Sequence, residues 1–289
     1  MYYSASIGVL CSVLIIVSLR AVKSEVTLEK NAYKDVVVTV AGDVQPTDVG
    51  EFFNRLEALL RSASKALFKA TNGLWYFGEF RIVVPPGFQT PPSLLLRNAT
   101  WELFTDADVV VNNGTGTDAR QSGGCGRPGG YVVLPEDDVF STDIEAAARS
   151  LIRRWVQVRY GVFEETATAL SPQWCYKDGH VWKPTGCYST NATIRRLDSA
   201  GDGVQCTEED VSIENIFQNG VGPASSLLFT STSREVELLC DSSGDHLHMP
   251  LAPTKHNLIC DGQSAWDVIR TSEDYKMTQF VSHYTIPPL

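Results

Sequence analysis

The chain has 289 residues, of which 43% are hydrophobic, so it can bury the core of one large domain or of two small ones. Its formal net charge of −10 at pH 7 argues against a nucleic-acid partner, because phosphates require a basic surface. The acidity otherwise indicates only a well-hydrated exterior.

The first 24 residues are predicted to be a signal peptide. They contain an uncharged apolar run over 7–19, which has the length of a signal-peptide core and is short for a membrane-spanning helix. No basic residue precedes this run, and a signal anchor is the alternative interpretation. The predicted organisation is a signal peptide (1–24), an N-terminal subdomain (25–165) and a cysteine-rich C-terminal subdomain (166–289).

The N-terminal subdomain alternates strands with two long helices. An amphipathic helix is predicted from about Val49 to Thr71, because apolar side chains recur there every three or four positions before Gly73. A second helix is predicted to be capped by Thr142 and to end at Gly161. Strands rich in β-branched residues are predicted within four ranges, 35–42, 79–85, 107–116 and 124–136.

This order of elements predicts an α+β (α/β-like) fold up to about residue 165. The following region, 166–222, is rich in cysteine and poor in helix signals, and one further helix is predicted around 224–239.

Six cysteines follow the predicted signal peptide, and Cys11 lies within it. An even number in an exported chain predicts disulfides, although the connectivity stays open; the candidates are Cys125, Cys175, Cys187, Cys206, Cys240 and Cys260. No C-x-x-C pair occurs, which argues against a structural zinc site. Three N-x-T tripeptides, at Asn98, Asn113 and Asn191, are candidate glycosylation sites and favour the same extracellular localisation.

The stretch "SLIRRWVQVRYGVFEE" (150–165) has the layout of a zinc-protease helix without its histidines. In H-E-x-x-H enzymes two histidines on one helical face bind zinc and the glutamate activates water. Here Arg153 and Gln157 take the histidine positions, Arg154 takes that of the glutamate, and Glu164 and Glu165 follow Gly161 where an acidic ligand belongs. Because arginine has no lone pair to offer and a glutamine oxygen is a poor zinc ligand, we expect no catalytic residue and no metal. From the helix alone, an ordinary amphipathic helix with a solvated basic face is the favoured interpretation.

Other stretches change that interpretation. In this order along the chain, they are "LEKNAYKDVVVTV" (28–40), "ADVVV" (107–111), "CGRPGGYVVL" (125–134), "RYGVFEE" (159–165) and "AWDVIRTSEDYK" (265–276). Together they resemble the N-terminal domain of the calcium-activated chloride channel regulator family, which has a zincin-like metalloprotease fold. The resemblance implies a vestigial active-site helix and a disulfide between Cys240 and Cys260.

Family members continue into a von Willebrand A-type domain with a D-x-S-x-S metal site. This sequence has "DSAGDG" (198–203) and "DSSGD" (241–245), which lack that spacing. The sequence is therefore interpreted either as part of a longer protein or as a free-standing N-terminal domain.

The resemblance implies a secreted pseudo-metalloprotease, without cofactors, that binds and modulates an extracellular or cell-surface protein such as a chloride channel. It would reach the membrane only through that partner. One alternative is an active zinc protease whose rearranged site uses His180, His246 or His248; another is a structural domain of an adhesion-type protein. His246 and His248, with Asp245 or His256 nearby, are predicted to lie in a solvated loop. An ion pair between Arg153 and Glu164 or Glu165 is predicted to replace the metal.

Overall fold

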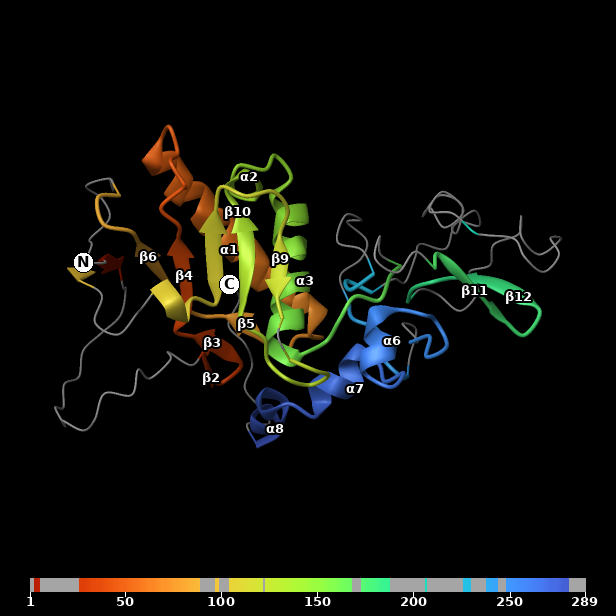
Figure 1. Ribbon diagram of the computed structural model, residues 1–289. Coiled ribbons are helices and arrows are strands. Elements are labelled where there is room, and N and C mark those ends of the chain that lie inside the picture. Colours follow the sequence, from red (N-terminus) through yellow and green to blue (C-terminus); the bar gives the residue numbers. More distant parts are fainter. Residues whose placement is uncertain are drawn as a thin grey trace.

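The computed structural model is a mixed α+β structure (Figure 1). Its largest sheet has seven strands in the order β7-β1-β6-β4-β8-β10-β9. No helix in the described part of the chain is long and apolar enough to cross a membrane. The structure describes residues 3–5, 26–88, 97–98, 104–121, 123–167, 173–187, 206, 226–229, 238–243 and 248–280.

The centre of this sheet consists of four parallel strands. These are β4 (Val36–Val40), β6 (Phe80–Val84), β8 (Val109–Asn112) and β10 (Tyr131–Pro135). All five residues of β4 are buried, as expected for a parallel strand covered on both faces. The β-branched runs in the sequence therefore predicted these four strands correctly.

Antiparallel strands form the edges. Strand β9 (Asp118–Arg120) pairs with β10, and β1 (Tyr3–Ala5) lies between β6 and β7 (Arg97–Asn98). Strand β1 comes from the segment predicted to be a signal peptide, and the cleavage of that segment stays a prediction. A separate small sheet contains β2 (Thr27–Glu29), β3 (Ala32–Lys34) and β5 (Tyr76–Phe77).

Two long helices pack side by side on the sheet (Figure 1). Helix α1 (Val49–Ala70) begins after Asp48, whose carboxylate accepts a hydrogen bond from the backbone N–H of Glu51. Helix α3 (Ile144–Tyr160) is capped by Asp143 and not by Thr142, because the Asp143 carboxylate accepts from the N–H of Ala146. The short elements η1 (Phe104–Asp106) and α2 (Glu136–Val139) complete the N-terminal part.

In the region after residue 165, the described residues form a hairpin and three short helices. They are β11 (Cys175–Asp178), β12 (Val181–Pro184), α6 (Lys255–Ile259), α7 (Ala265–Arg270) and α8 (Glu273–Phe280). The helix predicted around 224–239 is wrong at its described positions. Ser226 forms a β-bridge with Leu238, and 227–229 form a turn.

Six cysteines form three disulfides, Cys125–Cys260, Cys175–Cys206 and Cys187–Cys240. The expectation of disulfides is confirmed, but the pair Cys240–Cys260 is wrong. The glycine-rich turn before β10 brings Cys125 to the end of α6, where Cys260 lies, and leaves Cys240 to pair with Cys187.

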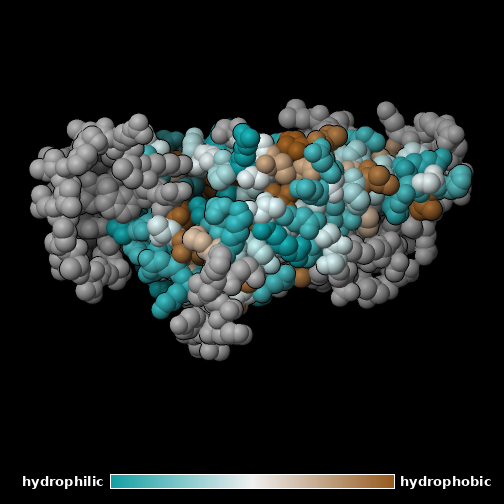
Figure 2. Space-filling model, turned by 90° about the horizontal axis from the view of Figure 1, so that it is seen from below, coloured by the Kyte–Doolittle hydropathy of each residue, from teal (hydrophilic) through white to brown (hydrophobic). Residues whose placement is uncertain are grey.

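One hydrophobic core extends across residue 165. Besides side chains of the sheet, α1 and α3, it contains Leu227, Leu228, Trp266, Val268 and Ile269. On the face seen from below, hydrophilic side chains cover most of the described area and hydrophobic ones form small separate clusters (Figure 2).

Candidate functional site

Helix α3 ends where the sequence predicted, at Gly161. This residue is left-handed, with φ of 62°, and its N–H donates to the carbonyl of Gln157. A Cβ added here would lie 2.3 Å from the backbone nitrogen of Arg127, so the glycine also permits close approach of the turn before β10. Gly126 and Gly129 of that turn donate to the carbonyls of Gly161 and Val158. The chain leaving α3 is therefore fixed just before the two glutamates.

The vestigial site predicted on α3 is a cluster of charged and polar side chains. Arg154 donates through Nη1 to Glu164 Oε1 at 2.5 Å and to Gln157 Oε1 at 3.1 Å, while its Nε donates to the carbonyl of Thr117. Arg153 Nη2 lies 3.4 Å from the same Glu164 oxygen. Two guanidinium groups thus share one carboxylate, and Arg154 makes the closer contact.

Burial and charge set the protonation of this cluster. Burial lowers the pKa of Arg153 to about 10, with Glu164 opposing that shift, so the guanidinium keeps its proton at neutral pH. Burial alone would raise the pKa of Glu164, but the hydrogen bond from Arg154 and the charges of both arginines outweigh it and lower the pKa. Arg153 and Glu164 are therefore both ionised near pH 7.

These residues do not fit a zinc ion. A guanidinium that stays protonated has no lone pair for a metal, and two of them repel a divalent cation. Glu164 is already bound to both arginines, and Arg154 cannot accept a proton from water. What this arrangement can do is tie α3 to the loop after Gly161 and to the residue before β9.

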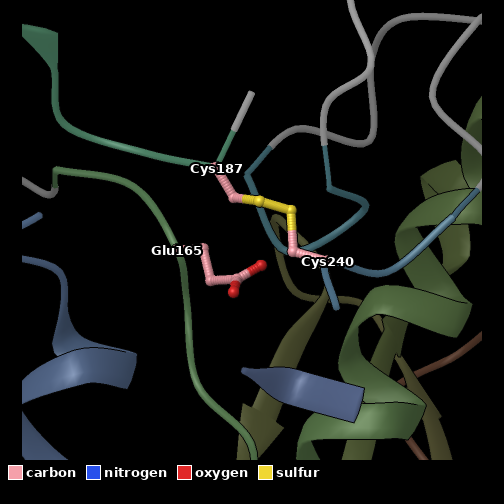
Figure 3. A group of neighbouring side chains, drawn as sticks. All are labelled: Glu165, Cys187 and Cys240. Carbon is pink, nitrogen blue, oxygen red and sulfur yellow. A yellow bond between two sulfur atoms is a disulfide. The ribbon is translucent and has the colours of Figure 1, made fainter. Parts of the chain in front are cut away.

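The side chain of the next residue, Glu165, points to the other side of the chain from that of Glu164. Glu165 is 1% exposed, and its Oε1 accepts a hydrogen bond from His248 Nδ1 at 3.1 Å. Its carboxylate points toward the Cys187–Cys240 disulfide (Figure 3). The Glu165 carboxylate and both Sγ atoms lie within 4.8 Å of one another, which makes them the one cluster of three potential metal ligands among the described residues.

The prediction of a solvated loop is wrong at His248, whose side chain is 5% exposed. His256 is fully buried, and the ring centroids of the two histidines are 5.9 Å apart. His256 Nδ1 accepts from the N–H of Phe163, and its Nε2 donates to the carbonyl of Gln263, so the ring is neutral. Burial lowers the pKa of His256, Glu165 opposes this effect, and His248 adds to it. The sequence contained one signal of this burial: both histidines lie between Cys240 and Cys260. Each of these cysteines forms a disulfide, which holds the segment between them in place.

The remaining candidates lie at exposed positions of the described chain, in β7 or outside the described residues. His180 lies in the exposed turn between β11 and β12, and His246 and Asp245 lie outside the described residues. Asn113 is exposed, as glycosylation requires; Asn98 belongs to β7 and Asn191 is not among the described residues. Glycosylation stays a prediction at all three.

The sequence did not indicate a third group of residues, which anchors α8. Asp274 accepts two hydrogen bonds from Arg159 and one from the hydroxyl of Tyr33. The hydroxyls of Tyr33 and Tyr160 are also hydrogen-bonded to each other. The hydrogen-bonded partners in this group are more than 100 residues apart in the sequence, so no local sequence pattern could have predicted their contact.

The chain is similar to known proteins over most of its length. A family model described as calcium-activated chloride channel N terminal matches residues 26–282. Human calcium-activated chloride channel regulator 1 is 25% identical over 272 residues, which cover 88% of this chain and 29% of that relative. Human calcium-activated chloride channel regulator 2 is 23% identical over 305 residues, covering 97% and 31%. The mouse regulator 1 is 26% identical over 286 residues, covering 92% and 30%.

The chain thus spans less than a third of the length of these relatives. No solved structure matches it. Because the family model covers most of the chain, the protein belongs to the calcium-activated chloride channel regulator family.

Proposed function

We propose that this chain is a secreted, zincin-like pseudoprotease domain that acts by binding and modulating a chloride channel or another cell-surface protein. The binding role extends to this chain what the names of its relatives say of them. The non-catalytic role depends on the residues of α3.

The ion-pair cluster on α3 is the observation that carries the proposal. The positions that would bind zinc in an H-E-x-x-H helix hold Arg153 and Gln157, and Arg154 replaces the general base. Glu164, an acid in the position of a third ligand, is bound by both arginines. A positively charged pair in place of the metal supports a structural role for the former active-site helix.

Three disulfides support the extracellular localisation, because disulfides persist in oxidising compartments and are rare in the cytosol. Asn113, a predicted glycosylation site, is exposed, as attachment of a glycan requires.

Whole-cell recording from cells with a calcium-activated chloride current tests this function. Purified protein added outside the cells should change the current, and a zinc chelator should leave that change intact. Crosslinking on the same cells should capture the surface protein that is bound, with heat-unfolded protein as the control. A change in current that the chelator abolishes, together with cleavage of a surface protein, would contradict the non-catalytic role. No effect on the current and no crosslinked surface protein would contradict the binding role.

A further inference from the structure

The surroundings of Glu165 leave two buried polar atoms unsatisfied. Glu165 Oε2 and His248 Nε2 are both inaccessible to solvent and have no hydrogen-bond partner among the described residues. The Glu165 side chain is 1% exposed and that of His248 is 5% exposed. Buried polar atoms are nearly always paired, so the unpaired carboxylate oxygen of Glu165 requires an explanation.

The neighbouring disulfide does not satisfy the carboxylate. Sulfur atoms in a disulfide carry no proton to donate and no positive charge, so the Cys187–Cys240 bond gives Glu165 nothing to bind. Burying a carboxylate with a single hydrogen bond is unfavourable. The same two cysteines as thiolates, however, would be strong ligands for a divalent cation that also binds carboxylate.

We propose that reduction of the Cys187–Cys240 disulfide creates a buried Zn²⁺ site formed by both thiolates and Glu165. A dithiol reductant would transfer two electrons and two protons to the disulfide, breaking the S–S bond and becoming a disulfide itself. Binding of Zn²⁺ would then release the two thiol protons to solvent. In the oxidised protein both sulfurs are bonded to each other, so the site exists in the reduced state alone.

The geometry needs little rearrangement. Sulfur ligands lie about 2.3 Å from zinc and carboxylate oxygens about 2.0–2.2 Å, so ligand atoms of a tetrahedral site are separated by roughly 3–4 Å. The three candidate ligand atoms already lie within 4.8 Å of one another. His248, hydrogen-bonded to Glu165, would orient the carboxylate as histidine–carboxylate pairs do around zinc.

This site is distinct from the vestigial one on α3. Glu164 and Glu165 are consecutive, but Glu164 binds the arginines and Glu165 points to the disulfide. A zinc content that depends on reduction would therefore leave the pseudoprotease proposal unchanged, because the oxidised protein is predicted to contain none.

Differential alkylation tests the proposal in the unmodified protein. The purified chain is reduced with a phosphine, which does not bind zinc as a dithiol does, and is alkylated with and without one equivalent of Zn²⁺. Zinc should protect Cys187 and Cys240 at least tenfold more than Cys175 and Cys206, a second disulfide pair that belongs to no cluster of three potential metal ligands among the described residues. Equal alkylation of both pairs with zinc present would overturn the proposal.

A second measurement identifies the ligands. Co²⁺ added to the reduced protein should give a thiolate-to-metal charge-transfer band, which the oxidised protein lacks. Cys187→Ser should abolish the band, Glu165→Gln should weaken metal affinity at least tenfold, and Cys175→Ser should have no effect. A band that persists in Cys187→Ser, or unchanged affinity in Glu165→Gln, would contradict the assignment.

Discussion

In the α/β body, residues 26–165, apolar side chains of β4, α1 and α3 form most of one continuous core, whereas the segment after residue 165 adds fewer side chains to that core and is also held by other interactions. In that segment, the hairpin packs on a small cluster that includes the Cys175–Cys206 disulfide. Cys125–Cys260 joins the segment to the body, and Asp274 anchors α8 to Arg159 of α3. The body therefore depends mainly on hydrophobic burial, and the segment combines a few apolar side chains in the same core with covalent bonds and buried polar contacts.

The largest expected effect is the loss of the Cys125–Cys260 disulfide. The bond closes a loop of 135 residues, and the chain-entropy model assigns about 5 kcal/mol to a loop of that length. Cys125→Ser with Cys260→Ser should lower the free energy of unfolding by roughly that amount, measured by urea denaturation.

The matched control is Cys175→Ser with Cys206→Ser, which opens a loop of 31 residues and should cost about 1 kcal/mol less. A larger loss in the control would show that this hairpin bond stabilises the protein more than the bond joining segment and body.

Asp274→Ala should remove the polar anchor of α8. Asp274 is 4% exposed, and its loss leaves the half-buried Arg159 guanidinium without its carboxylate partner. The expected cost is roughly 3–5 kcal/mol in the free energy of unfolding. The neighbouring Glu273→Ala, which breaks an exposed pair with Lys276, should cost at most about 1 kcal/mol. Equal effects of the two substitutions would contradict a buried anchor.

The sequence predicted the body much better than the segment, and the reason is physical. Helices α1 and α3 are long enough for apolar side chains to repeat, and β4 is a run of buried residues. Helices α6, α7 and α8 have five, six and eight residues, too few for a periodic signal. The start of α7 could nevertheless have been predicted from the sequence, because Ser264 and Asp267 have the spacing of the capping box that they form.

The candidate site was predicted in composition but not in contacts. The spacing of Arg153, Arg154 and Gln157 on one helix indicated which side chains gather near Glu164. It did not indicate that Arg154 would make the closest ion pair, because that depends on the carbonyl of Thr117, supplied by a loop more than 30 residues away. Disulfide pairing depends on the same long-range folding.

The next prediction compares the stability cost of alanine at two glycines with positive φ, Gly161 and Gly179. At Gly161 an alanine would have both an unfavourable left-handed conformation and a Cβ 2.3 Å from the Arg127 nitrogen, so we expect a cost of about 2–4 kcal/mol. Gly179, in the hairpin turn, has φ of 63° but nothing within 4 Å of an added Cβ. Gly179→Ala should therefore cost about 1–2 kcal/mol, by thermal or urea unfolding. Similar costs would show that the turn before β10 can move away.

Glu164→Gln should have a smaller, pH-dependent effect. Because the folded-state pKa of Glu164 is lowered, its ionised form stabilises the protein above the ordinary pKa of 4.5, and this contribution is lost as the pH falls through the folded-state value. We expect a cost of about 1–2 kcal/mol at pH 7, in urea unfolding, that shrinks in acid.

The control is Glu57→Gln, in an exposed pair with Arg61, which should change stability by at most about 0.5 kcal/mol at any pH. A cost for Glu164→Gln that does not depend on pH would contradict the charge-based explanation.

The zinc content of the purified, oxidised protein tests the central claim most directly. Elemental analysis should find far less than one equivalent, and a chelator should not lower the unfolding temperature, because Arg153 and Gln157 cannot bind the metal. The matched variant combines Arg153→His, Arg154→Glu and Gln157→His, which also releases Glu164 from both arginines, and it should bind about one equivalent. Stoichiometric zinc in the unmodified oxidised protein would contradict the account and make an active metalloprotease the better explanation.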